Sequence, residues 1–398
     1  MRRQLIGNRN LIRAINRSTV LNTIKTWGPL SRTEIAKRTG LSAATITAIS
    51  AELLESNLVF EKEAGDSSGG RKPILLALNP RGGYVIGAKL TEDHISAALT
   101  DLEATVLDRR TVPLAEVSQA AVLDSFCQVV NHMLEMNAVD RRRFYGIGVG
   151  LAGIVDPARG LLRQSPIFGW DQVLLANLLC KSVEAPVYID NDVNTLTLTE
   201  LWFGRGQGID NFLTVTIGRG VGLGIVLGGK LYSGDRGGAG EFGHTVVDPD
   251  GPLCACKKRG CLETYVSDPA MVRQAQEAGL PVESVENLVQ LAETGNEAAR
   301  AVLSRAGEIL GRAIANLVNV LVPQLIILSG EGVRAGEWLF APMRRALEAQ
   351  VMPPLCSDLN VQIDEWDEYA WARGAAGLVL RRLFESPVEW GLETAPRQ

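Results

Sequence analysis

The stretch GGAGEFGHTVVDPDGPLCACKKRGCLET, residues 237–264, places one histidine and three cysteines close together in the chain. His244 lies ten residues before Cys254, and Cys256 and Cys261 follow within CACKKRGC. Three thiolates and one imidazole fill a tetrahedral zinc site, which is structural because no position is left for water. Three reduced thiols beside an unrelated histidine are the alternative, but clustered cysteines in a cytosolic chain favour a metal over disulfides. We therefore expect one structural zinc ion per chain.

Two acidic residues, Glu241 and Glu263, bracket the predicted zinc loop, which would bring them together. A second stretch, PVYIDNDVN at 186–194, is typical of a strand that ends in Asn191 and Asp192. Sheets of α/β proteins place ligand groups at such strand ends. Carboxylates and amides suit vicinal hydroxyls because each oxygen accepts an O–H hydrogen bond. These residues predict a sugar site, against the alternatives of a polar turn and ordinary surface acids.

The chain has 398 residues, which is long enough for two or three domains. Its apolar content of 46% and charged content of 21% are ordinary for a soluble globular protein. No apolar run reaches the roughly 18 residues of a membrane span, and the basic start lacks the apolar core of a signal peptide. We expect a cytoplasmic protein with no membrane partner.

Charge is distributed unevenly along the chain. Residues 1–80 carry 12 Lys and Arg against 6 Asp and Glu, a net charge of +6, whereas the whole chain has −5. The remaining 318 residues therefore carry −11. A basic segment joined to an acidic body indicates that the basic part meets a polyanion.

Three helices are expected in this basic segment. The first covers 8–26; in the second, Ser31 and Glu34 form a capping box and Gly40 ends the helix; the third starts at Ser42. The apolar residues of the first and third helices recur near a 3.6-residue period: Leu11, Ile12, Ile15, Val20, Leu21 and Ile24, then Ile46, Ile49, Leu53 and Leu54. Two helices joined by a glycine turn predict a helix-turn-helix.

The next segment, LVFEKEAGDSSGGRKPILLALNP at 58–80, is typical of two strands joined by a basic, Gly- and Ser-rich tip. Basic wing tips lie against phosphates or in a minor groove. We therefore expect a winged helix-turn-helix over residues 1–80 that binds a double-stranded DNA operator, rather than a helical packing module. The expected DNA contacts are Arg32, Thr33, Ser42, Ala43, Ala44, Thr45, Thr47, Arg71 and Lys72.

The remainder of the chain repeats one plan. YVIGAKL, HISAALTDL and TVLDRRTVPL alternate like three neighbouring strands, followed by a helix at 119–136 and the strand YGIGVGLAGIVD. FLTVTIGRG, VGLGIVLGGKL, several helices and LIILSGEG repeat this order. The repeat predicts a two-lobed α/β fold with lobes at 81–190 and 191–373, the zinc in the second, and a C-terminal helix at 374–386 that packs back on the first. A doubly wound dinucleotide-binding fold fits less well because no GxGxxG opens a helix.

The chain resembles the ROK family of repressors and sugar kinases over nearly its whole length. GVGLAGIVDP, DNDVNTLTLTELWFGRG, GAGEFGH and CACKKRGCLE are similar to its glycine-rich turn, its Asn-Asp helix entry, and its sugar and zinc signatures. The resemblance implies an actin-like, hexokinase-type body that assembles as a homodimer or homotetramer. It also implies zinc bound by His244, Cys254, Cys256 and Cys261, and sugar bound by Asn191, Asp192, Glu241, His244 and Glu263.

Several positions depart from the pattern of the family's kinases. Their first strand carries DxGxT, where this chain reads AKLT with Ala88 and Leu90. Their second phosphate loop, GTG, reads Gly218-Arg219-Gly220 here. Glycines at such loops let the backbone approach phosphate. Glu331 adds a carboxylate near the expected nucleotide position. Asp192 matches the kinases' base, and we expect it to accept a hydroxyl rather than to catalyse, so that no catalytic residue remains.

Together these features predict a repressor of carbohydrate-metabolism genes that lacks kinase activity and is controlled by a sugar or sugar phosphate. The ligand is expected to close the two lobes and to change the spacing of two winged helices in a dimer, which read half-sites one helical turn or a multiple apart. An active sugar kinase with an accessory head, or a regulator that senses a sugar-transport protein, are the alternatives. Lys257, where the family commonly has glycine, is a departure within the zinc motif.

Overall fold

The computed structural model describes residues 9–63, 73–357, 359–364 and 368–387. The chain divides into two compact units, the first formed by residues 1–190 with 372–398 and the second by residues 191–371. Among the described residues, no helix has the length and apolar character needed to span a membrane.

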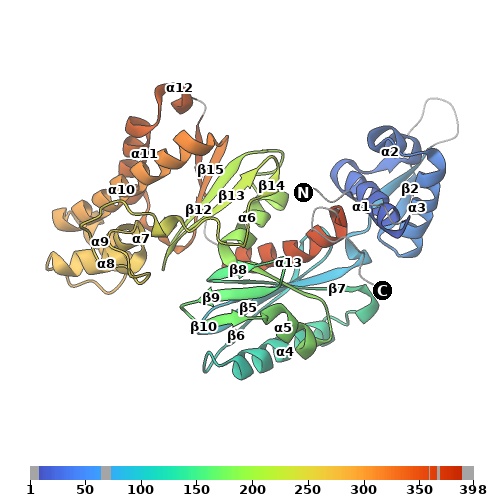
Figure 1. Ribbon diagram of the computed structural model, residues 1–398, viewed down its shortest axis with the longest axis horizontal. Helices are drawn as coiled ribbons and strands as arrows, with labels where there is room; N and C mark the ends of the chain where they lie inside the picture. Colours follow the sequence, from blue (N-terminus) through green and yellow to red (C-terminus); the bar gives the residue numbers. More distant parts are fainter. Residues whose placement is uncertain (1–8, 64–72, 358, 365–367, 388–398) are drawn as a thin grey trace. The chain divides into compact units, whose positions relative to one another are not determined.

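The N-terminal part of the first unit, called the head (residues 9–63 and 73–78), has three helices and a small antiparallel sheet (Figure 1). Its elements are α1 (Arg9–Trp27), β1 (Leu30–Ser31), α2 (Arg32–Thr39), α3 (Ala43–Glu55), β2 (Val59–Glu63) and β3 (Ile74–Leu78), with strand order β1-β3-β2. The predicted capping box is confirmed: the Ser31 N–H donates to the Glu34 carboxylate at 2.9 Å, and Ser31 Oγ accepts from the Glu34 N–H. Gly40 ends α2 with φ 70°.

Most of the predicted apolar residues of α1 and α3 form the core of the head, although Ile15 and Leu54 are only half-buried. Ile24 and Ile46 are buried, whereas Ile12 is 49% exposed. The expectation for Ile12 was wrong because it follows the buried Leu11 directly, and successive residues of an α-helix are rotated by about 100°. The wing tip at 64–72, with Arg71 and Lys72, lies outside the described residues.

The rest of the first unit is built on a five-stranded sheet of order β11-β7-β4-β5-β6. Its elements are β4 (Tyr84–Leu90), β5 (His94–Thr100), β6 (Val106–Pro113), α4 (Gln119–Met136), β7 (Phe144–Leu151), α5 (Leu175–Val183) and β11 (Val187–Asn191), beside a short sheet of β8 (Ile154–Asp156), β9 (Leu161–Ser165) and β10 (Trp170–Val173). Helices α4 and α5 cover one face and α13 (Glu368–Phe384) the other (Figure 1). Gly87 and Gly148 allow this approach, because a Cβ at either would meet the α13 backbone.

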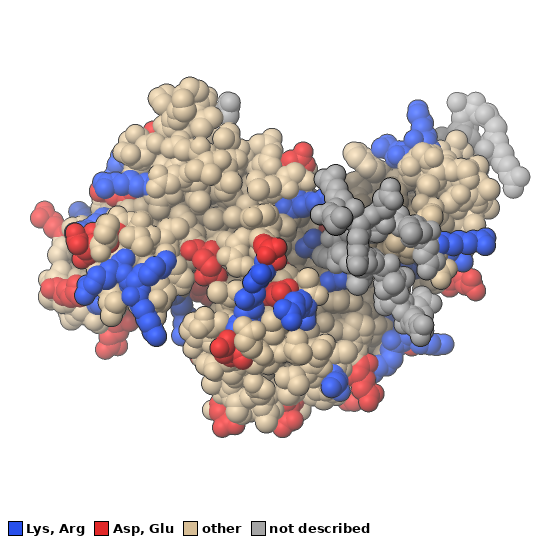
Figure 2. Space-filling view, viewed as in Figure 1, with Lys and Arg blue, Asp and Glu red and all other residues tan. Residues whose placement is uncertain are grey.

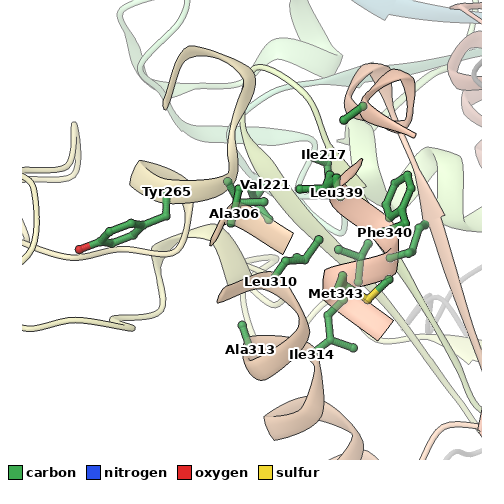
Figure 3. Packing of buried hydrophobic residues seen from close by; sticks show 14 of the residues in the cluster. Ile217, Val221, Tyr265, Ala306, Leu310, Ala313, Ile314, Leu339, Phe340 and Met343 are labelled. Carbon is green, nitrogen blue, oxygen red and sulfur yellow. The ribbon is translucent and has the colours of Figure 1, made fainter. Parts of the chain in front are cut away.

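The second unit has its own five-stranded sheet, of order β14-β13-β12-β15-β16. Its elements are α6 (Asp192–Phe203), β12 (Phe212–Ile217), β13 (Val221–Leu227), β14 (Lys230–Leu231), α7 (Glu263–Val266), α8 (Asp268–Glu277), α9 (Val285–Glu293), α10 (Glu297–Leu321), β15 (Leu325–Ser329), α11 (Glu337–Gln350), α12 (Pro353–Cys356) and β16 (Asn360–Ile363). Helices α10 and α11 pack closely, and Leu310 and Ile314 face Phe340 and Met343 in the core (Figure 3).

The two five-stranded sheets share one plan. In each, an antiparallel hairpin (β4–β5 and β12–β13) continues through a parallel strand on the other side of its first strand (β7 and β15). The predicted repeat of an α/β unit is therefore confirmed, and with it the two-lobed α/β class.

Candidate metal and ligand site

The four predicted metal ligands come together in the second unit. Their ligand atoms all lie within 4.8 Å of one another. His244 Nδ1 is 3.6 Å from Cys254 Sγ, and Cys256 Sγ is 3.6 Å from Cys261 Sγ. Zn–S bonds of about 2.3 Å at tetrahedral angles place neighbouring ligand atoms roughly 3.7 Å apart. The cluster therefore has the donors and the spacing of a site that can hold a metal.

The loop that carries these ligands is held by its own contacts. The Leu262 N–H donates to the Thr245 carbonyl at 2.9 Å, and the Tyr265 hydroxyl donates to the Asp248 carboxylate at 2.8 Å. Gly260 has φ 65°, and a side chain there would collide with the Asp248 carbonyl. These contacts bring the two ends of the loop together without using the four ligands.

Lys257, the departure within the zinc motif, adopts φ 73°. This left-handed conformation favours glycine, because a Cβ there approaches the following carbonyl. The chain thus keeps the backbone geometry for which glycine is suited while carrying a lysine. Its neighbour Lys258 donates from Nζ to the His244 carbonyl at 2.8 Å, which ties this end of the loop to a ligand.

The carboxylate of Glu241 lies beside the metal cluster. Glu241 Oε2 is 4.0 Å from His244 Nε2. Burial raises the pKa of the Glu241 carboxyl; His244 opposes this rise, and the negative charges of Glu263 and Asp192 add to it. Glu263 and Asp192 therefore lie within electrostatic range of Glu241.

The imidazole of His244 joins the metal cluster to the carboxylates. Its Nδ1 faces Cys254, whereas its Nε2 faces Glu241. In metal sites the histidine nitrogen that does not bind the metal commonly donates to a carboxylate or a carbonyl, which fixes the ring. One side chain can therefore serve both roles that the sequence assigns to His244.

Strand β13 is the common support of the ligand residues. The Val221 N–H donates to Glu263 Oε2 at 3.1 Å, and a Cβ on Gly222 would meet Val193 in the first turn of α6. That turn begins at Asp192 and is capped by Asn191, whose Oδ1 accepts the Val193 N–H at 2.8 Å. Asn191 and Asp192 thus lie where strand β11 passes into helix α6, as predicted.

The turn between β12 and β13, residues 218–220, faces acidic side chains. A Cβ on Gly218 would meet the Glu331 carboxylate, so this carboxylate fills the space above the turn. The Asp268 N–H donates to the Gly218 carbonyl at 2.7 Å. Sequence reasoning anticipated Glu331 but missed Asp268, because nothing in the local pattern links α8 to this turn.

The Asp268 carboxyl has an altered affinity for protons. Burial raises its pKa to about 6; Arg334, 3.9 Å away, opposes this rise, and Glu331 and Glu286 add to it. Arg334 also pairs with Glu286. Acidic groups thus gather at a turn where the family's kinases are expected to bind phosphate.

The AKLT stretch of β4 places Ala88 and Leu90 on one face of its sheet and Lys89 on the other. Ala88 and Leu90 are fully buried in the apolar core with Phe126 of α4. Because side chains alternate along a strand, Lys89 shares the opposite face with Gly87.

The described DNA-contact candidates lie on α2 and at the start of α3. Thr33, Ser42, Ala43, Ala44 and Thr47 are exposed, and Thr45 and Arg32 are half-buried. Ser42 caps α3 by accepting the Thr45 N–H, and Arg32 pairs with Glu61 of β2 at 2.8 Å. In Figure 2, basic side chains lie at the upper and right edges of the visible face of the head. The N-terminal turn of α3 is thus accessible and lined by small side chains.

Comparison with known proteins agrees with this architecture. Residues 85–382 match the ROK family and residues 15–61 match the MarR family. The chain is 28% identical to the xylose repressor of Bacillus spizizenii over 96% of this chain and 98% of that protein. It is 29% identical to the DNA-binding transcriptional dual regulator NagC of Escherichia coli over 95% of each.

A solved structure shows the same arrangement. A ROK family transcriptional regulator, a homologue of the E. coli MLC protein, superposes with a TM-score of 0.85 at 30% identity, over 94% of this chain and 97% of that one. The chain therefore belongs to the ROK family. The predicted fold, a winged helix-turn-helix head with a two-lobed, actin-like body of the sugar-kinase type, is confirmed.

Proposed function

We propose that this protein is a DNA-binding repressor of carbohydrate-metabolism genes whose DNA affinity is controlled by a sugar or sugar phosphate. The observation that carries the proposal is the presence in one chain of a helix-turn-helix head and a ROK body that gathers Asp192, Glu241, Glu263 and His244. The relatives named xylose repressor and NagC support it. The ligand acts by binding one of two states of the protein more tightly than the other.

Sugar hydroxyls suit the donors and acceptors of this site. Asn191, Asp192, Glu241 and Glu263 supply oxygens that accept O–H hydrogen bonds, and His244 Nε2 adds a further polar contact. The cluster of His244, Cys254, Cys256 and Cys261 holds one structural zinc ion. When bound, the metal supplies no reaction chemistry here; it fixes the His244 ring beside Glu241.

The body does not act as a kinase in this proposal. Ala88 and Leu90 stand where the kinases carry DxGxT, Arg219 occupies the turn, and Glu331 lies against Gly218. A carboxylate at this turn repels the phosphates of a nucleotide. Asp192 remains as a hydroxyl acceptor.

In the head, α3 enters the major groove with Ser42, Ala43, Ala44, Thr45 and Thr47 at its N-terminal end. Arg32, Thr33, Arg71 and Lys72 contact the backbone. A homodimer or homotetramer presents two heads to half-sites one helical turn or a multiple apart. The cytoplasmic location stays a prediction.

Two assays on the purified protein test the proposal. A thermal-shift panel of sugars and sugar phosphates should contain at least one stabilising ligand, because a ligand that binds the folded state raises its stability. If no sugar or sugar phosphate stabilises the protein, the effector is a protein partner instead of a sugar. An ADP-release assay over the same panel should show no turnover, and robust turnover would sink the non-kinase assignment.

A further inference from the structure

We propose that helix α13 couples the sugar site to the DNA-binding head. Its first turn supports the helix that begins at Asp192, and its last turn contacts α1 of the head. The inference rests on the proposed function, because coupling requires both a sugar and a DNA ligand. The geometry points to Trp371 as a positioning residue and to the contact of Lys25 with Phe384 as the link to the head.

The first turn of α13 lies in the second unit, which ends at Trp371. Trp371 is only 5% exposed and packs against Val193 and Leu196 in the first turns of α6. Helix α6 begins at Asp192, so the indole supports the helix segment that carries a sugar-site carboxylate. A movement of Asp192 on sugar binding would therefore act directly on the start of α13.

The middle of α13 lies in the first unit and is packed backbone to backbone. A Cβ on Gly87 of β4 would collide with the Ala372 carbonyl, and one on Gly148 of β7 would collide with the Ala375 carbonyl. No long side chain lies between the helix and the sheet at these points to absorb a displacement. Close-packed contacts of this kind transmit strain.

The last turn of α13 reaches the head. Phe384 is 1% exposed, and Lys25 Nζ of α1 lies 5.0 Å from the centre of its ring. An ammonium over an aromatic face is held by a cation–π interaction. Burial lowers the pKa of Lys25 to about 8, while Glu385 and Glu103 oppose this change. Lys25 is thus built into the contact between the head and α13.

Helix α1 passes this contact on to the predicted recognition helix α3. Arg13 and Arg17 of α1 both pair with Glu52 of α3, at 2.8 and 3.0 Å. The described residues therefore form a continuous series of packed elements from α6 through α13 and α1 to α3. Each unit contributes its own part of the series, and α13 is the element that belongs to both.

The test measures how strongly sugar changes the affinity of the full chain for DNA from its own promoter region. Xylose and N-acetylglucosamine, the sugars that appear in the names of related repressors, are the probes. We expect saturating sugar to change the wild-type dissociation constant about tenfold. Lys25→Ala and Phe384→Leu should each reduce this factor to less than about threefold, while sugar affinity stays within about twofold of wild type. In Trp371→Ala, sugar should no longer change the DNA dissociation constant. Trp371→Phe keeps an aromatic ring and should restore most of the sugar effect.

Matched variants separate coupling from general damage. Lys181→Ala removes an exposed lysine of α5, and Phe340→Leu alters a side chain as buried as Phe384 in the core of the second unit. In both variants, sugar should change the DNA dissociation constant as much as in the wild type. The proposal is overturned if folded Lys25→Ala and Phe384→Leu proteins also keep the wild-type sugar effect. If the proposed function is wrong, the wild type itself will show no sugar-dependent DNA binding. That result would overturn both the proposed function and the coupling through α13.

Discussion

At the residue scale, His244 shows what spacing along a chain can and cannot predict. The ten-residue spacing from His244 to Cys254 indicated a shared metal, and the ligand atoms do gather within 4.8 Å. The orientation of the imidazole, with Nδ1 toward Cys254 and Nε2 toward Glu241, depends on loop contacts that no local pattern encodes. Asp268 was missed for the same reason, because it lies far from the Gly218 turn in the sequence.

Lys257 offers a direct test of backbone strain in the metal loop. Lys257→Gly should leave stability unchanged or raise it by up to ~1 kcal/mol, because glycine adopts the positive φ without steric cost. Lys257→Val should lower stability by ~1–3 kcal/mol, since a β-branched residue fits this conformation poorly. Thermal unfolding of the metal-loaded proteins measures the difference, and equal melting temperatures for the two variants would refute the assigned strain.

Asp268 should make stability depend on pH in a defined direction. Its pKa rises from 3.8 to about 6 on folding, so between these values the folded state keeps a proton that the unfolded state has released. The contribution of Asp268 to stability therefore falls as the pH rises from about 4 to 6, and it stays low above that range. Asp268→Asn should stabilise the protein by ~1–3 kcal/mol at pH 7 and by much less at pH 4.

Denaturant unfolding of wild type and Asp268→Asn at the two pH values measures this effect. Glu293→Gln, at an exposed acid of α9, is the matched control and should show little effect at either pH. An Asp268→Asn effect of the same size at pH 4 and pH 7 would contradict the raised pKa.

At the scale of elements, local signals predicted boundaries well where a cap or a glycine decides them. The capping box of Ser31 and Glu34 and the glycine at position 40 placed α2, and the helix predicted at 119–136 has the bounds of α4. The sheet of β8, β9 and β10 was not predicted. Its short strands follow tight turns, such as the one at Gly169 (φ 65°), and carry too few residues for a two-residue period to emerge.

Loss of the metal from the loop at 241–263 should also weaken sugar binding. Cys256→Ser should lower the metal content from about one zinc per chain, loosen residues 241–263 and weaken sugar binding about tenfold or more, because His244 then loses its fixed orientation. Cys356→Ser, outside the cluster, is the control and should bind sugar normally. Metal analysis with calorimetric sugar titration provides the measurement, and unchanged sugar affinity in Cys256→Ser would count against the loop's role.

At the scale of the whole molecule, the repeated strand pattern predicted the two lobes, and the charge distribution with the helix-turn-helix pattern predicted the basic head. The pattern could not reveal that α13 belongs to both units. Its sequence places small residues such as Ala372 and Ala375 where they meet glycines of distant strands, and this pairing is visible only in the fold. Long-range contacts of this kind decide how a ligand site and a DNA-binding head can communicate.

Binding of the full chain to DNA from its own promoter region, with and without a sugar identified by thermal shift, tests the central claim most directly. We predict a preference for this DNA over random DNA, an affinity that falls steeply with salt because phosphate contacts release counterions, and a change of about tenfold when sugar saturates the protein. Equal affinity for promoter and random DNA, unaffected by any sugar that the protein binds, would contradict the assignment as a sugar-controlled regulator.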